Sequence, residues 1–291
     1  MSEKIPPGKA DEDRERSAAE EEEAADGPPM TFWEHLDELR KRLVWSLVAF
    51  FVATGVVWNY HEKLKDILAT PFVEAWKQQG LPGTSGLHSA APASEFVAYF
   101  KLSMVGGVLL ASPFIFYQLW GFIAPGLYAR EKRFVIPFVL FSTLLFCGGA
   151  YFAYRVAIPI SLTYFLSLSG GEVAVTPTWM IDTYFEYVGQ LLLGFGAVFE
   201  LPLLLLFLSI AGVVNYLQLM RFGRWFVLVA FVIGAILTPP DVTSQIVMSI
   251  PLCLLYFLSI GLAYLFGKPP TDAQREAYRK SKQKEEGRSE P

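Results

Sequence analysis

The chain carries little charge outside its two ends. Only 18% of its 291 residues are Asp, Glu, Lys or Arg, against about 25% in a soluble domain of ordinary composition. Residues 1–29 contain a run of acidic residues and residues 268–291 contain charges of both signs, whereas the stretches between them have almost none. This distribution argues against a soluble globular protein. It predicts a membrane domain over residues 30–267, flanked by a disordered acidic N-terminal tail and a charged cytoplasmic C-terminal tail.

The residue types that build metal sites and catalytic centres are also scarce. The 2 cysteines each lie inside an apolar run and outside any CxxC motif, and the 3 histidines are far apart in the sequence. The sequence contains no zinc-protease motif, no phosphate-binding loop and no Ser–His–Asp pattern. We therefore expect no metal, no cofactor and no enzymatic activity. The acidic N-terminus also lacks the basic region that opens a cleavable signal peptide.

The apolar stretches predict an all-α membrane protein with six transmembrane helices in a concave bundle, the fifth and sixth of them short. An amphipathic helix should begin with a capping box at Thr31 and run directly into the first span. Residues 156–168 are apolar but reach only about 20 Å as a helix, so we expect them to lie at the membrane interface. The predicted spans are residues 43–58, 96–120, 134–154, 184–210, 222–237 and 246–266.

The basic residues predict the orientation of this six-span chain. Most Lys and Arg residues in the connecting segments fall on the side that also holds both termini. Because cytoplasmic loops carry an excess of Lys and Arg, both termini are predicted to lie in the cytoplasm. A seventh span at residues 156–168 would place the basic C-terminal tail outside.

Four segments together resemble one protein family. They are residues 32–43 (FWEHLDELRKRL), 117–131 (YQLWGFIAPGLYARE), 195–202 (FGAVFELP) and 238–245 (TPPDVTSQ). In this order and topology they are similar to TatC, the signal-peptide receptor of the twin-arginine protein translocase. The resemblance covers about residues 30–266, and the acidic N-terminal extension departs from it.

The resemblance implies a receptor that exports folded proteins with twin-arginine signal peptides across the bacterial cytoplasmic (inner) membrane. It implies transport driven by the proton-motive force, single-span partners of the TatA and TatB type, self-association in a larger complex, and contact with membrane lipid but not with nucleic acid. From the residues alone, two alternatives stay open. A proton-coupled small-molecule transporter would use Glu200 as its proton site, but we find no internal repeat. An intramembrane enzyme would need convergent nucleophiles or metal ligands within the spans.

Two carboxylates are the first candidates for binding a signal peptide. Glu38 precedes the first span and Glu131 follows the second, so both should lie at the basic cytoplasmic surface, where a dicationic signal needs acidic partners. The alternative for Glu38 is an ion pair with Arg42 in its own helix, and for Glu131 it is a solvated loop charge. The resemblance adds Phe122 and Tyr128 as further contacts, and Arg40 either orients the acidic residues or sets topology.

Glu200 is the candidate functional residue inside the membrane. Pro202 follows it and should bend the fourth span at this point, which suggests a concave, water-reachable face. The alternative is a protonated carboxyl group that only hydrogen-bonds a neighbouring helix. Around the outer turn between the last two spans, Thr238, Asp241 and Gln245 are weaker candidates for contacts with partner helices. Asp241 as a helix cap is the simpler interpretation.

Overall fold

A computed structural model describes residues 32–80, 86–123, 135–168, 178–237, 242–272 and 274–276, and the described residues form an almost wholly helical bundle. Six of its helical stretches are long and apolar enough to cross a membrane, which confirms the predicted all-α fold with six spans. The fifth and sixth candidate spans, of 21 and 19 residues, are the shortest of these six, as predicted. The helices in chain order are α2 (Phe32–Trp58), α3 (His61–Gln78), α4 (Pro92–Ile123), α5 (Val135–Phe152), η3 (Ala153–Ala157), α6 (Ile158–Ser167), α7 (Ile181–Phe199), α8 (Leu201–Ile210), α9 (Tyr216–Leu237) and α10 (Val242–Phe266).

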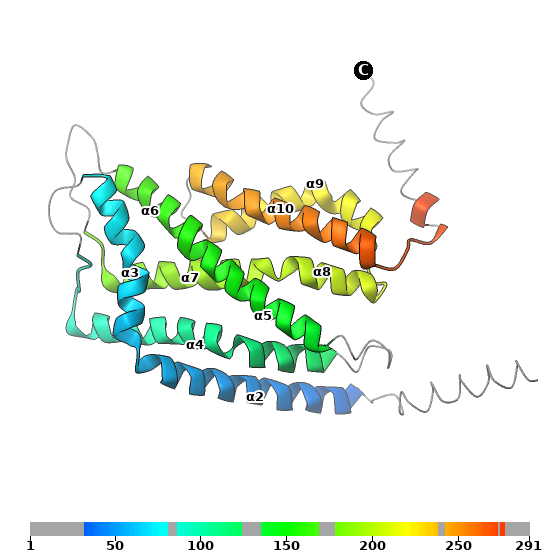
Figure 1. Cartoon of the computed structure of the whole chain (residues 1–291), viewed down its shortest axis with the longest axis horizontal. Coiled ribbons are helices and arrows are strands. Elements are labelled where there is room, and N and C mark those ends of the chain that lie inside the picture. Colours follow the sequence, from blue (N-terminus) through cyan, green and yellow to red (C-terminus); the bar gives the residue numbers. More distant parts are fainter. Residues whose placement is uncertain are drawn as a thin grey trace, which may run out of the picture.

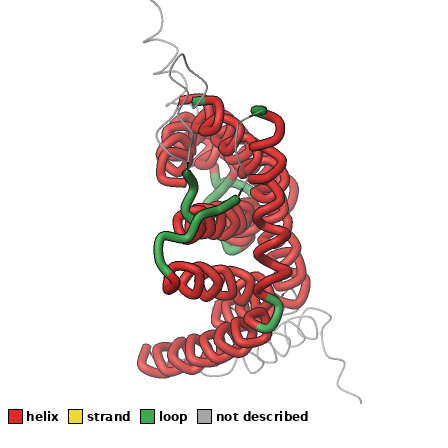
Figure 2. The backbone as a smooth tube through the Cα atoms, turned by 90° about the vertical axis from the view of Figure 1, so that its left-hand side faces the viewer, coloured by secondary structure: helices red, strands yellow, loops and turns green. Residues whose placement is uncertain are grey.

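The helices are arranged as an open bundle. Helix α2 lies along one edge and packs mainly on α4, while α9 and α10 pair with each other at the opposite edge (Figures 1 and 2). Helices α7 and α8 run between these edges, and α5 crosses the bundle diagonally against α4 and α7 (Figure 1). The first and last spans therefore do not meet to close a ring, in keeping with the concave bundle that the sequence predicts.

The first helix is continuous, as the amphipathic pattern predicts. Helix α2 runs for 27 residues from Phe32 to Trp58 and includes both the amphipathic segment and the first span. It approaches α4 closely at Gly107, where a Cβ atom would lie 2.9 Å from the Cα atom of Thr54. A side chain at this position would push the two helices apart, so the contact depends on glycine.

The third span, made of α5, η3 and α6, is longer than the sequence predicts. Residues 156–168, expected as a separate interfacial segment, continue the preceding helix, and 135–167 form one candidate span of 33 residues. The π-helical turn η3 joins the two parts, and the N–H of Ile158 donates to the carbonyl of Ala153, five residues back. Pro159 has no N–H to continue an α-helical ladder, and the wider turn accommodates it without ending the helix.

The fifth span begins earlier than predicted. Helix α9 starts at Tyr216 rather than at residue 222, and its 22 residues reach about 33 Å instead of about 24 Å. Asn215 and Gln218 form a reciprocal capping box, with each backbone N–H bonded to the other side chain at 3.0 Å. The predicted start was wrong because Arg221 and Arg224 interrupt the apolar run, although a helix end tolerates exposed basic residues.

The connection between the first two spans contains a helix that was not predicted from the sequence. Helix α3 buries an apolar face at helical spacing and packs on α6. The backbone of His88 pairs with Trp179 and Ile181 at 2.8 and 2.9 Å, and the hydroxyl of Tyr184 donates to the carbonyl of Leu68 at 2.8 Å. These bonds fix the connection to the start of α7.

Two neighbouring glycines on α5 provide a matched test of this packing. A Cβ atom at Gly149 would lie 2.5 Å from the carbonyl oxygen of Phe195 on α7, whereas one at Gly148 would meet nothing within 4 Å. We expect Gly149→Ala to destabilise the protein by about 1–3 kcal/mol because the helix backbones must separate. Gly148→Ala should leave stability unchanged or slightly higher, since alanine favours helix. Thermal unfolding of both variants in the same detergent checks this, and equal midpoints would contradict the close α5–α7 contact.

Candidate functional site

The start of α2 lies against the end of α4, where two predicted contacts of the signal peptide are found. Phe122, near the end of α4, stacks on the ring of His35 with centroids 4.4 Å apart and ring planes at 17°. Glu38, one turn further along α2, is largely covered, with 20% of its side chain exposed. The structure therefore brings Phe122 and Glu38 to the same helix junction.

Glu38 already holds a guanidinium group. Arg42 donates from Nε and Nη2 to the same carboxylate oxygen, Oε1, at 2.9 and 2.6 Å. The other oxygen, Oε2, is buried and has no hydrogen-bond partner. The ion pair that was the alternative interpretation of Glu38 is thus formed, but it uses only one of the two oxygens.

Gly121 allows this ion pair to lie against α4. A Cβ atom at position 121 would overlap the guanidinium group of Arg42, so the absence of a side chain lets that group rest on the helix. The sequence analysis did not single out Gly121 or Arg42 as site residues. The sequence did contain an indication of both residues, because Gly121 falls inside the matched segment 117–131 and Arg42 inside segment 32–43.

Arg40 lies on a different face of α2 from Glu38. Residues two positions apart in an α-helix point about 200° apart, so Arg40 faces away from the α4 contact. It is exposed and lines a shallow hollow with Asp37, Lys41, Val44 and Trp45. Arg40 therefore does not orient Glu38 through contact, and its role in signal binding stays a prediction.

Four of the predicted site residues lie outside the described residues. These are Glu131, Tyr128, Thr238 and Asp241. Gln245 is described, and its side-chain amide donates to the carbonyl of Phe231 on α9 at 2.8 Å. The predicted contact of Gln245 with a partner helix stays a prediction, alongside this bond within the chain.

Glu200 lies at the break between α7 and α8, as the sequence predicts. Helix α7 ends at Phe199 and α8 begins at Leu201, and the carbonyl of Glu200 accepts the N–H of Leu204 at 2.9 Å. The Oε1 atom of its side chain is buried and has no hydrogen-bond partner among the described residues. The interruption of the helix and an acid with one buried oxygen therefore coincide within the fourth candidate span.

An ion pair links the first third of α4 to the first third of α7. Lys101 donates to Glu186 at 2.6 Å, and both side chains are exposed, by 43% and 65%. Their exposure lets such long side chains extend along the bundle surface toward the interface. The sequence analysis missed its partner because Glu186 follows only two residues after the predicted start of the fourth span.

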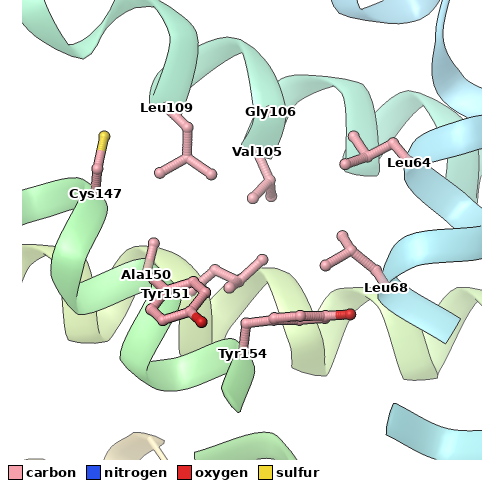
Figure 3. A pocket seen from close by; sticks show the side chains of 10 residues that line it. Leu64, Leu68, Val105, Gly106, Leu109, Cys147, Ala150, Tyr151 and Tyr154 are labelled. Carbon is pink, nitrogen blue, oxygen red and sulfur yellow. The ribbon is translucent and has the colours of Figure 1, made fainter. Parts of the chain in front are cut away.

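A pocket of about 230 Å³ lies among α3, α4, α5, η3 and α7, apart from the predicted site residues. Figure 3 shows its lining side chains directed toward a shared space from several helices. The lining includes no acidic or basic residue and consists of Leu64, Leu68, Val105, Gly106, Leu109, Cys147, Ala150, Tyr151, Tyr154 and Leu192. It offers apolar packing space and none of the groups that bind a cationic signal.

Comparison with known proteins agrees with this architecture. Residues 34–251 match the family described as Sec-independent protein translocase protein (TatC). The chain is 40% identical over 249 residues to the Sec-independent protein translocase protein TatC of Koribacter versatilis (strain Ellin345), covering 85% of this chain and 90% of that protein. The protein of the same name from Aquifex aeolicus (strain VF5) is 39% identical over 246 residues, covering 84% of this chain and 100% of that protein.

A solved structure is similar over the same region. The crystal structure of the twin-arginine translocase receptor TatC superposes with a TM-score of 0.70 at 40% sequence identity, covering 80% of this chain and 99% of that one. These matches support the translocase interpretation over a small-molecule transporter or an intramembrane enzyme. The chain therefore belongs to the TatC family of Sec-independent protein translocase proteins, which are multi-pass membrane proteins and not enzymes.

Proposed function

We propose that the chain is the receptor that recognises twin-arginine signal peptides and exports their folded cargo across the bacterial cytoplasmic membrane. Single-span partners of the TatA and TatB type and the proton-motive force complete the system. The observation that carries this proposal is the Glu38 carboxylate, which binds one guanidinium through Oε1 and keeps Oε2 free of any partner.

The chemistry of this carboxylate fits an arginine ligand. A guanidinium fork forms charge-assisted hydrogen bonds with carboxylates that are roughly twice as strong as neutral ones. Arg42 holds the carboxylate against α4, so the free oxygen is fixed in place before a signal peptide arrives. Because Oε2 is buried, an arginine of the signal is proposed to displace the groups that cover it while Arg42 keeps Oε1. Glu131, in the connection after α4, is proposed to bind the second arginine.

Phe122 lies beside this carboxylate, and Tyr128 is proposed to contact the signal there. Arg40, on another face of α2, stays a proposed contact of a different part of the signal peptide. The Phe122 ring, stacked on His35, supplies apolar area beside the carboxylate. The partner helices are proposed to bind near the connection between α9 and α10, through Thr238, Asp241 and Gln245. Self-association of the receptor in a larger complex is also proposed, from its membership of the TatC family.

The first prediction from this proposal is electrostatic. Glu38→Gln and Glu131→Gln should each weaken binding of an Arg-Arg signal peptide by about 1.5–3 kcal/mol, since each loses a charged hydrogen bond. Titration of a fluorescent Arg-Arg peptide against purified protein in detergent measures the loss. A Lys-Lys peptide should bind weakly to every form of the protein, because an ammonium group lacks the planar fork.

Asp37 provides the matched control for this experiment. It precedes Glu38 on α2 and carries the same charge, but it lines the hollow with Arg40 and Lys41 on another face. Asp37→Asn should leave signal affinity nearly unchanged. If Asp37→Asn weakens binding as much as Glu38→Gln does, the effect is general surface charge and the site is misplaced.

The second prediction concerns orientation, with both termini in the cytoplasm. After replacement of Cys147 and Cys253 by serine, Lys77→Cys on α3 should react with an impermeant maleimide added outside intact cells. Val213→Cys and Asp272→Cys should react only after the membrane is opened. Outside labelling of position 272 would show that the number or direction of spans differs from the six proposed.

Glu200 is proposed to act in signal insertion or transport rather than in binding at the surface. An acid at membrane depth costs at least about 2.5–3.5 kcal/mol when charged, so a purely lipid-facing position is disfavoured. The interruption between α7 and α8 at Glu200 and the buried, unpaired Oε1 support a role beyond packing.

The third prediction separates this role from packing. Glu200→Gln keeps the shape and hydrogen-bonding capacity of the side chain but removes any charge. We expect this variant to bind an Arg-Arg peptide with unchanged affinity and to export cargo poorly in a transport assay with membrane vesicles. Normal export by Glu200→Gln, together with loss of stability in Glu200→Ala, would leave Glu200 with a structural role only.

A further inference from the structure

The pocket among α3, α4, α5, η3 and α7 suits an apolar chain better than water. Its lining has no acidic or basic side chain, and the hydroxyl of Tyr154 already donates to the carbonyl of Ile67 at 3.0 Å. A water molecule in a cavity needs about two to four polar partners, whereas the remaining polar side-chain groups here are the Tyr151 hydroxyl and the Cys147 thiol. Lipid tails, which are as apolar as leucine, match such a lining.

The pocket is continuous with an apolar surface of the candidate spans. Its lining residues on α4, α5, η3 and α7 all belong to helices long and apolar enough to cross a membrane. On α5, Leu140, Leu144, Cys147 and Tyr151 follow one another at helical spacing and are all exposed. Figure 3 shows Tyr151 and Cys147 among the side chains that surround the pocket. A stripe that faces lipid tails in a membrane therefore leads into the pocket.

An arginine lies one helical turn beyond the exposed tyrosine. Arg155 follows Tyr151 by four residues, so the two lie close to the same side of the helix. The Arg155 side chain is exposed, and it forms no ion pair within the part of the chain that the structure describes. By contrast, Lys65 on α3 pairs with Asp66 at 3.3 Å. Arg155 therefore offers an uncompensated positive charge beside an apolar pocket.

The depths of these groups match the order of groups in a phospholipid. The third candidate span has 33 residues and is about 50 Å long, so its far end passes beyond a hydrocarbon core of about 30 Å. Arg155 lies about 30 Å along this span from Val135, near the level of the headgroups. Cys147 lies about 12 Å deeper, among the lipid tails. A cation thus stands at the depth of the phosphates, with apolar space below it.

We propose that one phospholipid, from the leaflet on the α3 side, binds with an acyl chain in the pocket and its phosphate group at Arg155. A guanidinium group matches a phosphate group in both charge and geometry. Leu64 and Leu68 of α3 cover the pocket, so the bound chain fills the space between α3 and the spans beneath it (Figure 3). This site is separate from Glu38 and Glu200 and does not depend on the function proposed above.

The experiment uses the full chain in phosphatidylethanolamine nanodiscs. They contain a small fraction of phosphatidylglycerol with a diazirine midway along one acyl chain, and peptides labelled on irradiation are mapped by mass spectrometry. Labelling should concentrate on the peptides that contain Leu109 and Cys147. A diacylglycerol with the same diazirine chain lacks the phosphate group, so it should label them about two- to fivefold less, as for one exposed ion pair. Even labelling of all exposed positions, including Leu254 on α10, would show general lipid contact and overturn the site.

Two variants test the two parts of the site, each with a matched control. Cys147→Phe fills the mouth of the pocket and should remove most of the labelling there. Gly148→Phe adds the same ring at a position outside the lining, where a Cβ atom meets nothing within 4 Å, and should leave the labelling unchanged. Arg155→Gln should lower the phosphatidylglycerol labelling to that of diacylglycerol, whereas Lys77→Gln, at an exposed residue of α3 outside the lining, should not. Equal losses in a variant and its control would contradict the proposal.

The labelling pattern of the unmodified protein decides the question even if a variant fails to fold. A polypeptide occupant is tested with an Arg-Arg signal peptide that carries a diazirine in its apolar region. If this peptide labels the Cys147 peptide and displaces the lipid label, the pocket binds the signal and the lipid site is rejected. An unchanged lipid label in the presence of the peptide supports the phospholipid.

Discussion

Close approach of helix backbones is the constraint on which the rest of this structure depends. Lipid tails are as apolar as leucine, so burial of apolar side chains gives little force between helices inside a membrane. Small residues compensate, because they let backbones approach and make many van der Waals contacts. Gly107 does this between α2 and α4 and Gly149 does it between α5 and α7, while Gly196 on α7 admits the ring of Phe146 on α5. At Gly121 the same property admits the guanidinium group of Arg42, so it shapes the candidate binding site as well.

Polar groups within the bundle follow from a second requirement, since no water is available in the hydrocarbon core to bind them. Gln245 reaches the backbone of Phe231 on the neighbouring helix, and Trp120 reaches Ser142. These bonds join α9 to α10 and α4 to α5. The unpaired Oε1 of Glu200 stands out against this background, which is why we assign it a role beyond holding helices together.

Much of the fold could be predicted from the sequence. Hydrophobic length identified six spans, and the proline at position 202 located the bend at Glu200. Boundaries were less accurate where a local feature outweighed apolar length. The fifth span, α9, begins earlier than its apolar run because Asn215 caps it. The third span continues past Pro159 because the π-helical turn η3 joins α5 to α6. Helix α3 was missed because its apolar face is short and lies among charged residues.

The candidate site could be predicted only in part, because sequence gives the identity of side chains but not the faces they share. Glu38 and Phe122 were placed at one junction as expected, whereas Arg40 proved to lie on a different face of its helix. The contacts of Gly121, Ser142 and Trp120 are made between helices far apart in the chain. No spacing rule within one segment indicates that Trp120 and Ser142 meet, 22 positions apart.

The last turn of α4 has a mechanical consequence. Trp120, Gly121 and Phe122 are consecutive, so they project about 100° apart around the helix axis. Their contacts are Ser142, the guanidinium group of Arg42 and the ring of His35. The end of α4 is thus in contact with other residues on three sides. A twist of α4 about its axis displaces all three contacts together, so its packing on α5 and the position of the Arg42–Glu38 pair on α2 change at the same time.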